Sequence, residues 1–285
     1  MTREEFKNLV ASGPVILDGA TGSNLMKAGM PKGVCTEQWI LEHKDILIDL
    51  KRGYAEAGSR ILYTPTFSAN RIALAKHGLD GDMESMIHQL VSLSQIALEP
   101  ECFVAGDMTT TGETDISYEK AYEVYQEQIT YLNDSNVDLL VIETMLTLEE
   151  TMAAVEAARS VCDLPMMCSM TIESDGSLFF GGNIFETAAA LQEIGADAVG
   201  INCSTGPDQL ESVISTLRDT LDIPIIAKPN AGMPVIDEKG NAIYNMTAED
   251  FAKHMKRLVD LGANLVGGCC GTTPEYIRAL VNILG

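Results

Sequence analysis

The sequence is poor in basic and aromatic side chains and has no long apolar run. Its 19 Lys and Arg stand against 41 Asp and Glu, which gives a formal net charge of −22. A field of this sign repels phosphate backbones and anionic membrane surfaces, so we predict neither nucleic acid nor a membrane as a partner. No stretch approaches the roughly 20 apolar residues that span a bilayer, and the charged N-terminus lacks the apolar segment of a secretion signal. We expect a cytoplasmic protein whose acidic surface serves solubility or docking to a basic partner.

The cysteine content does not indicate a disulfide framework. The seven cysteines are odd in number and irregularly spaced, so we expect reduced thiols. The following are interpreted as ordinary thiols, wholly or partly buried: Cys35, Cys102, Cys162 and Cys168. The hydrophobic fraction of 46% and the charged fraction of 21% are those of a folded globular chain. Because no low-complexity tract or linker divides the chain, we predict one domain over residues 1–285.

Short apolar runs alternate with longer amphipathic segments along the whole chain. Most runs are apolar at consecutive positions, which is typical of parallel strands covered on both faces. The predicted strands are 14–17, 60–63, 102–105, 138–142, 165–170, 196–201, 224–227 and 264–266. The predicted helices are 45–57, 82–98, 118–133, 148–161, 184–194, 209–221, 248–261 and 274–284. Eight strand–helix pairs in about 250 residues match the count and length of a (β/α)8 TIM barrel.

The predicted helix ends carry capping residues that agree with this pattern. Glycines stand where a helix C-cap needs a positive φ angle: Gly58, Gly195 and Gly262. Hydroxyl side chains stand at the N-cap positions: Ser117, Thr147 and Thr273. The rival fold is a doubly wound open sheet, which usually carries a glycine-rich dinucleotide turn after its first strand. Residues 18–22 read Asp-Gly-Ala-Thr-Gly and not G-x-G-x-x-G, so the barrel is favoured.

Three cysteines fall where a barrel places its chemistry, at the C-terminal ends of the strands. Cys203 follows the sixth predicted strand, and Cys269 and Cys270 follow the eighth, so a closed barrel directs all three to one mouth. Three thiolates around one point are typical of a zinc ion with an open fourth position. The alternative is that Cys203 is a buried thiol and that the adjacent pair serves packing or redox chemistry. The four histidines lie on predicted helices or helix edges, and no H-E-x-x-H motif is present.

The chemistry of such a site follows from its charge. Three anionic sulfurs make a zinc ion a poor Lewis acid for activating water, but they leave it suited to bind a fourth thiol, which loses its proton on coordination. A thiolate at neutral pH attacks electrophiles far faster than a protonated thiol does. The ligand set therefore indicates alkyl transfer to a substrate thiol.

These residues resemble a known family. The motifs that carry the resemblance, in chain order, are Asp18-Gly19-Ala20-Thr21-Gly22, Thr64-Pro65-Thr66-Phe67, Glu143-Thr144, Gly200-Ile201-Asn202-Cys203, Pro229-Asn230-Ala231-Gly232 and Gly267-Gly268-Cys269-Cys270-Gly271-Thr272. They are similar to those of the homocysteine S-methyltransferase family, which includes the homocysteine-binding module of cobalamin-dependent methionine synthase and betaine–homocysteine methyltransferase. The resemblance implies a (β/α)8 barrel and methyl transfer to homocysteine, or to a close thiol, giving methionine. It also implies one zinc ion per chain on Cys203, Cys269 and Cys270.

The resemblance further implies a subsite for the amino-acid end of homocysteine. There the acid after the fourth strand, Glu143, pairs with the ammonium, and the N–H groups of the turn at Asp18, Gly19 and Ala20 receive the carboxylate. The alternatives are a turn cap for Asp18 and a buried lysine partner for Glu143. Two further polar residues could orient these groups or could cap their own loops: Asp107 and Asn230.

The methyl donor is the least constrained part of the prediction. Relatives commonly differ at the positions of Thr21, Ser23 and Pro65, and these departures concern the donor pocket. The segment around Trp39 could cover the donor or anchor packing. Because the printed sequence ends soon after the zinc motif, we expect no folate-binding or corrinoid domain after it. The low aromatic fraction of 6% argues against a cage for a cationic donor, so methylcobalamin on a separate corrinoid protein is favoured over S-methylmethionine or betaine.

Two other classes of function remain open. A phosphate-binding barrel such as an aldolase would use Lys228 as its catalytic lysine and Gly267-Gly268 as a phosphate grip, but it leaves the cysteines unexplained. A zinc-storage or redox-sensing protein would bind metal without turning over homocysteine, and it leaves the acidic and glycine motifs without a role.

Overall fold

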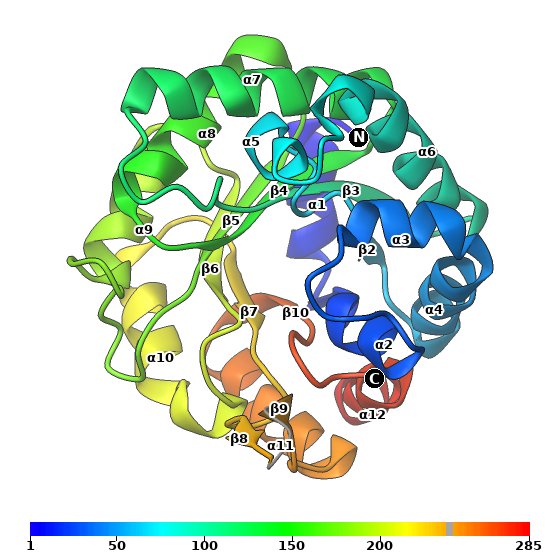
Figure 1. Ribbon diagram of the computed structural model, residues 1–285. Coiled ribbons are helices and arrows are strands. Elements are labelled where there is room, and N and C mark those ends of the chain that lie inside the picture. The colour runs from blue at the N-terminus through cyan, green and yellow to red at the C-terminus, as the bar shows by residue number, and fades with distance from the viewer. Residues whose placement is uncertain (238–241) are drawn as a thin grey trace.

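The chain folds as a barrel of parallel strands surrounded by helices, in a computed structural model that describes residues 1–237 and 242–285 (Figure 1). The barrel strands are β1 (Val15–Ile16), β2 (Ile61–Tyr63), β3 (Phe103–Met108), β4 (Leu139–Met145), β5 (Met166–Met170), β6 (Ala198–Asn202), β7 (Ile225–Lys228) and β10 (Ala263–Val266). Their order in the sheet is β1-β10-β7-β6-β5-β4-β3-β2. A parallel bridge between Leu17 and Ile61 joins the two ends of this order and completes the circle. The predicted (β/α)8 TIM barrel is confirmed, and the open doubly wound sheet is excluded.

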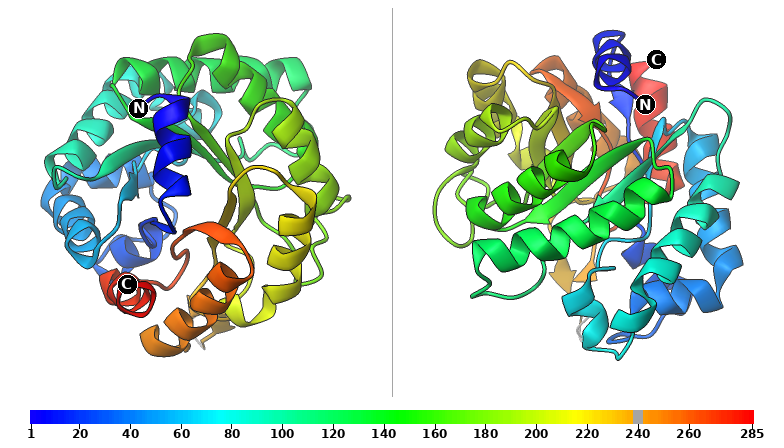
Figure 2. Two further views of the ribbon diagram at one scale, coloured as in Figure 1. Left: turned by 180° about the vertical axis from the view of Figure 1, so that it is seen from behind. Right: turned by 90° about the horizontal axis from the view of Figure 1, so that it is seen from above.

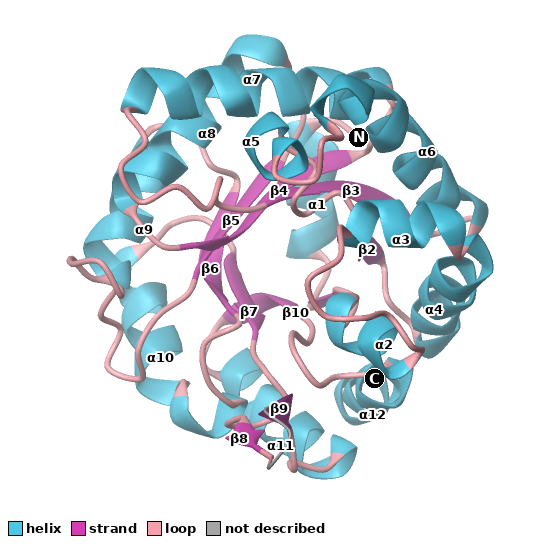
Figure 3. Ribbon diagram, in the orientation of Figure 1, coloured by secondary structure: helices cyan, strands magenta, loops and turns pink. Residues whose placement is uncertain are grey.

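A long helix follows each barrel strand at its predicted place and contributes to the outer ring (Figure 3). These helices are α4 (Lys44–Ala57), α6 (Met83–Ile96), α7 (Tyr118–Asp134), α8 (Leu148–Val161), α9 (Ile184–Glu193), α10 (Glu211–Thr220), α11 (Ala248–Asp260) and α12 (Pro274–Leu284). Within the described residues, no helix is both long and apolar enough to traverse a membrane.

The core has two layers because the strands are buried on both faces. A large apolar cluster lies between the sheet and the helices, and a smaller one fills the barrel. Helix α1 (Arg3–Ala11) lies across the end of the barrel seen from behind in Figure 2, where Phe6 and Val10 join the inner cluster. The pairing of β6 with β7 requires glycine at position 200, since a Cβ on Gly200 would lie 2.0 Å from the carbonyl oxygen of Ile226 in β7.

The sequence did not predict the short elements that stand around the opposite mouth. They are α2 (Gly22–Lys27), α3 (Thr36–Glu42), α5 (Arg71–Ala75), the 3-10 turns Asp80–Asp82 and Pro207–Gln209, and the hairpin of β8 (Val235–Ile236) and β9 (Ala242–Ile243). Each is too short to show a clear hydrophobic period. All of them belong to the connections that run from a strand's C-terminal end toward the next long helix, so they shape the mouth.

The predicted helix ends are confirmed with one correction. The three capping glycines have positive φ angles of 107°, 106° and 115°, and the side chains of Ser117 and Thr147 each accept a backbone N–H at 3.3 Å. Thr273 makes no such bond. Its helix begins with Pro274, whose fixed φ angle is already helical.

Candidate active site

A cavity of about 340 Å³ opens at the C-terminal ends of the strands. Its walls come from the ends of β3, β4, β6 and β7, from the loops after β1, β2 and β10, and from the start of α3. The cavity brings together these predicted site residues: Asp18, Gly19, Ala20, Asp107, Glu143, Cys203, Cys269 and Cys270. It does not include Asn230, whose side-chain amide donates to the carbonyl of Ser204 at 3.3 Å and braces the loop after Cys203.

Three cysteine side chains converge at this cavity. The sulfur atoms of Cys203, Cys269 and Cys270 all lie within 4.8 Å of one another, and the Sγ atoms of Cys203 and Cys270 are 3.5 Å apart. This is far longer than a disulfide bond of about 2.05 Å, and the thiols are free. Hydrogen bonds from Cys203 and Cys269 lower the pKa of Cys270 to about 3, while the hydrogen bond with Cys203 raises the pKa of Cys269. The arrangement therefore favours the deprotonated form of Cys270 within the trio.

The loops after β1 and β10 are hydrogen-bonded to each other. The hydroxyl of Thr272 accepts the N–H of Ala20 at 3.1 Å and donates to the carbonyl of Cys269 at 2.7 Å. Ser23 Oγ accepts the N–H of Gly271 at 3.2 Å. Ser23, one of the departures noted in the sequence, thus ties the first turn to the loop that carries two of the cysteines.

The first turn offers fewer free N–H groups than the sequence suggests. The N–H of Asp18 donates to the carbonyl of Ile61 at 3.1 Å, and that of Ala20 is taken by the threonine hydroxyl. Gly19 sits against the hydroxyl of Tyr54, which a Cβ at this position would approach to 2.6 Å. Only glycine fits there, and the carboxylate expected at this turn finds two of the three predicted donors already bonded.

A buried cluster of opposite charges forms part of the cavity floor. Lys51, from the middle of α4, places its ammonium 2.7 Å from Asp18 Oδ2, which also accepts the N–H of Tyr63 at 3.2 Å. The ammonium of Lys228 lies 3.5 Å from Asp18 Oδ1, 4.0 Å from Glu143 Oε2 and 4.5 Å from the centre of the Tyr63 ring. Burial alone would lower the pKa of Lys228, but Glu143 and Asp18 raise it above its usual value, so this lysine is charged. Asp18 is therefore an ion-pair partner of two lysines, and Glu143 does lie beside a barrel lysine.

Asp107 adds a third carboxylate. It is 4% exposed, and its Oδ1 atom has no hydrogen-bond partner among the described residues. Burial and the neighbouring charge of Glu143 raise the pKa of Asp107 well above its usual range. Burial also raises the pKa of Glu143, against the opposing effect of Lys228. With these carboxyl groups, the cavity floor can accept a further positive charge.

Asn202 is a central polar residue of the site that sequence reasoning missed as an individual group. Its side-chain oxygen accepts the N–H of Thr144 at 2.8 Å and the hydroxyl of Ser169 at 2.9 Å. Its amide donates to Thr144 Oγ1 at 2.7 Å and to Glu143 Oε2 at 3.2 Å. Thr144 and the adjacent Cys203 have φ angles of 60° and 49°, which non-glycine residues adopt only at a cost in free energy. Asn202 thus links the strained end of β4, which carries the carboxylate of Glu143, with the strained backbone of Cys203 after β6.

The segment around Trp39 contains one residue that serves packing and one that lines the cavity. Trp39 stacks on His43 with ring centres 4.1 Å apart and packs with Leu25 and Ile40, so it anchors packing. Glu37, two residues earlier, lines the cavity and accepts the N–H of Ser68 at 3.0 Å. The segment therefore reaches the cavity through the start of α3 and not through its aromatic ring.

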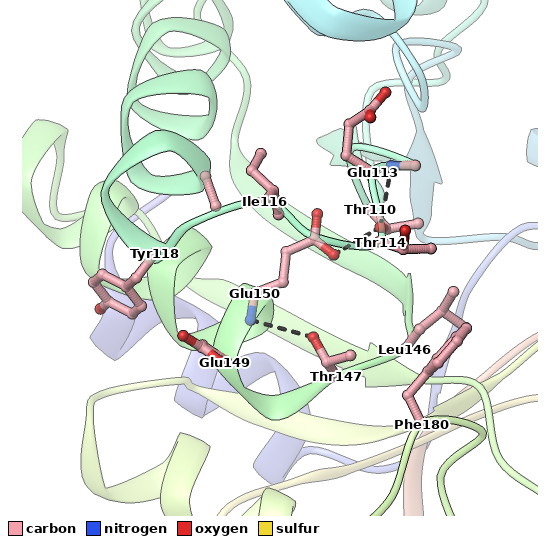
Figure 4. A pocket seen from close by; sticks show the side chains of 12 residues that line it. Thr110, Glu113, Thr114, Ile116, Tyr118, Leu146, Thr147, Glu149, Glu150 and Phe180 are labelled. Atoms are coloured by element: carbon pink, nitrogen blue, oxygen red, sulfur yellow. Dashed lines mark hydrogen bonds between the residues drawn. The ribbon is translucent and has the colours of Figure 1, made fainter.

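A second cavity of about 340 Å³ lies farther out along the loops after β3 and β4 (Figure 4). In its wall, the carboxylate of Glu150 accepts hydrogen bonds from the hydroxyls of Thr110 and Thr111 and from that of Tyr125 at 2.7, 2.8 and 3.0 Å. Glu150 is thus fully engaged in holding the β3 loop against α7 and α8.

Comparisons with known proteins agree with this geometry. The family model described as homocysteine S-methyltransferase matches residues 15–284. The chain is 30% identical to the methionine synthase of Mycobacterium leprae (strain TN) and 28% identical to that of Mycobacterium tuberculosis (strain ATCC 25618 / H37Rv), over 92% of its own length. It spans only 23% and 24% of these two relatives, about a quarter of their length.

Among solved structures, the fold is shared with the homocysteine methyltransferase MmuM from Escherichia coli. The TM-score is 0.81 for its oxidized form and 0.79 for its metallated form, at 23% and 22% identity and over 95% of this chain and 96% of that one. The family model covers nearly the whole chain. The chain belongs to the homocysteine S-methyltransferase family.

Proposed function

We propose that this chain is a zinc-dependent methyltransferase that methylates the sulfur of homocysteine and yields methionine. The observation that carries the proposal is the convergence of Cys203, Cys269 and Cys270 on a cavity whose floor bears buried carboxylates and ammonium groups. A homocysteine molecule with its thiol at the three sulfurs and its amino-acid end at the charged side chains would fill this one cavity.

The three sulfurs fit a zinc ion. Tetrahedral geometry with Zn–S bonds of about 2.3 Å places sulfur atoms roughly 3.8 Å apart, and Cys203 and Cys270 have their sulfurs 3.5 Å apart. When bound, a zinc ion held by three thiolates supplies a fourth position where a substrate thiol loses its proton at neutral pH. One ion per chain would occupy this site.

Side chains of the cavity floor bind the amino-acid end of the substrate. Glu143, near the C-terminal end of β4, attracts the ammonium of the substrate. In the reaction, the bond between the methyl group and its donor breaks while the sulfur–methyl bond forms, and the thiol proton is lost before attack. The protein's task is to fix the thiol facing the mouth, from which the donor arrives.

The rim of the mouth favours a donor carried by another protein. The described residues include ten exposed large apolar side chains, and all but Ile96 and Ile283 lie on loops and short elements of this mouth. They include Phe179 and Phe180 after β5 and Ile236 of the β8–β9 hairpin, which is 65% exposed. An apolar rim on an acidic chain suits a macromolecular partner, so we favour a methyl-corrinoid protein over S-methylmethionine or betaine. Methyl transfer to another small thiol is the remaining alternative.

The phosphate-binding alternative is weakened by two observations. Gly267 and Gly268 donate their N–H groups to the carbonyls of Ala227 and Asp18 at 3.1 Å each, so they do not form a phosphate grip. Lys228 is held charged by its carboxylate neighbours and is a poor nucleophile at neutral pH.

Methionine formation and zinc content test the proposal together. The zinc-loaded protein receives homocysteine with methylcobalamin or S-methylmethionine in parallel, and methionine is measured. We expect Cys203→Ala, Cys269→Ala and Cys270→Ala each to lose zinc and activity, while Cys168→Ala, a buried thiol of β5 outside the cluster, keeps both. Full zinc retention in any of the three variants would refute the site, and zinc binding without methionine formation from either donor would favour a storage protein.

A further inference from the structure

Main-chain hydrogen bonds hold the loop that carries Cys269 and Cys270 against the loop after β7. The N–H of Cys269 donates to the carbonyl of Pro229 at 2.7 Å, and the carbonyl of Cys270 accepts the N–H of Ala231 at 2.9 Å. Only the Cβ atom separates a cysteine sulfur from the backbone, so the backbone position largely determines where the two sulfurs can lie. Whatever fixes the rest of this loop therefore affects the arrangement of the three cysteines.

The other end of this loop is bound by Asn24 of α2. The side-chain nitrogen of Asn24 donates to the carbonyl of Thr272 at 2.8 Å and to the carbonyl of Ala20, in the turn after β1, at 2.7 Å. These two bonds use both hydrogens of the amide group. The hydroxyl of Tyr54, 3.2 Å from the same nitrogen, also donates to the Ala20 carbonyl, at 2.8 Å. Asn24 thus joins the cysteine loop to the first turn, although it lies 248 residues from Thr272 along the chain.

Asn24 contacts the site through main-chain atoms. The described residues that line the cavity include Ser23 but not Asn24. Ser23 Oγ accepts the N–H of Gly271 at 3.2 Å, and the Thr272 hydroxyl donates to the carbonyl of Cys269 at 2.7 Å. The cysteine loop is therefore bonded at both of its ends, and Asn24 supplies the bond to the Thr272 carbonyl.

A zinc site with three sulfur ligands tolerates little displacement of its ligands. Zn–S bonds measure about 2.3 Å, and a sound site keeps them within about 0.2 Å of this value. If a cysteine loop moves freely, the ion itself must order it, and the entropy that the backbone loses then subtracts from the binding free energy. A loop that the chain already holds avoids this loss, so a side chain that holds the loop should strengthen zinc binding.

We propose that Asn24 is a positioning residue for zinc, whose bonds to Thr272 and Ala20 hold the Cys269–Cys270 loop in the conformation that binds the ion. The inference rests on the zinc site of the proposed function and adds a residue that is neither a ligand nor part of the cavity wall. Removing the partners of metal ligands commonly weakens metal binding 10- to 100-fold. Because Asn24 acts through the backbone and not on a sulfur, we expect a loss at the low end of this range, about 10-fold.

Two measurements on the reduced protein test this role. In competition with a chromophoric chelator, Asn24→Ala should bind zinc roughly 10-fold more weakly than the wild type. In hydrogen exchange of the zinc-free protein, the amides of residues 268–273 should exchange faster in Asn24→Ala, and added zinc should slow them again. The amides of β4 and α8 should exchange at the wild-type rate. Lys27→Ala is the matched control, since Lys27 is exposed on the same helix, and it should equal the wild type in both measurements.

The outcomes separate a positioning role from a general effect on stability. Wild-type zinc affinity in Asn24→Ala, or unchanged exchange of residues 268–273, overturns the assignment. Faster exchange throughout the barrel, with β4 and α8 included, also overturns it, because Asn24 would then act on the stability of the whole fold. Asn24→Ser, which keeps one donor, replaces an alanine variant that does not fold by circular dichroism. It should show the same local changes, and wild-type zinc affinity in it overturns the role equally.

Failure of the proposed function gives a different result. If the wild type binds no zinc, the zinc site fails and the role of Asn24 fails with it. If the wild type binds zinc but forms no methionine, only the proposed function fails, and the zinc affinity and exchange of Asn24→Ala still decide the role of Asn24.

Discussion

Replacing Asn202 by alanine should destabilise the protein far more than the loss of one exposed side chain would. The substitution removes four buried hydrogen bonds, two made by the side-chain oxygen and two by the amide nitrogen. At about 1 kcal/mol for each bond, and with the N–H of Thr144 left unpaired, we expect a loss of about 3–5 kcal/mol in the free energy of unfolding. The left-handed backbone at Thr144 should also relax, because the substitution removes the bond that its N–H donates to Asn202.

Urea denaturation of the metal-free, reduced protein measures this loss without a contribution from zinc. Asn230→Ala is the matched control, since this asparagine is equally buried but donates one long bond of 3.3 Å and leaves its Oδ1 atom without a partner. The control should cost about 1 kcal/mol or less. Equal losses in the two variants, or a loss below about 1.5 kcal/mol for Asn202→Ala, would refute the reasoning.

Three further predictions concern stability. Because burial raises the folded-state pKa of Asp107, the folded chain binds a proton there that the unfolded chain has lost, so stability should rise as the pH falls from above this raised pKa toward the unfolded value of about 3.9. Asp107→Asn should flatten this dependence, and parallel curves for variant and wild type would contradict it. Gly200→Ala should prevent folding, since its Cβ meets a backbone oxygen at 2.0 Å, while Gly22→Ala, which has nothing within 4 Å, should fold normally by circular dichroism. Ser117→Ala should cost about 1 kcal/mol in thermal or urea unfolding, whereas Thr273→Ala, which removes no cap bond, should cost less than about 0.5 kcal/mol.

The barrel could be predicted because its signals are local and repeated. Each buried strand is an apolar run, each long helix has a clear period, and glycines such as Gly58 mark the ends with a positive φ angle. The cysteine cluster followed from the same source, since Cys203 and the Cys269–Cys270 pair close two strands whose ends a barrel brings to one mouth. The fold sets the position of a motif at a strand end, so identifying the barrel was enough to locate the cysteine cluster.

The charge cluster could not be predicted in this way. Lys51 lies in the middle of an amphipathic helix, where a lysine usually faces solvent, and nothing near it in the sequence indicates that it reaches Asp18. Its burial depends on the angle at which α4 packs against the loop after β1, which is a property of the whole barrel. The same holds for the occupied N–H groups of the first turn, because Thr272, the partner of Ala20, is 252 residues away along the chain.

The backbone at Thr144 and Cys203 shows why the site depends on such distant bonds. Neither residue type favours the left-handed conformation, so each strand end must be held there by partners outside its own loop. Asn202 supplies them for Thr144, and the N–H of Cys203 donates to the carbonyl of Lys228 in β7 at 3.3 Å. The cysteine, the carboxylate of Glu143 and the lysine are therefore connected through one hydrogen-bonded unit that spans three strands. A substrate that touches the sulfur and the charged floor at once meets groups whose separation the barrel has already fixed, which lowers the entropy that binding must overcome.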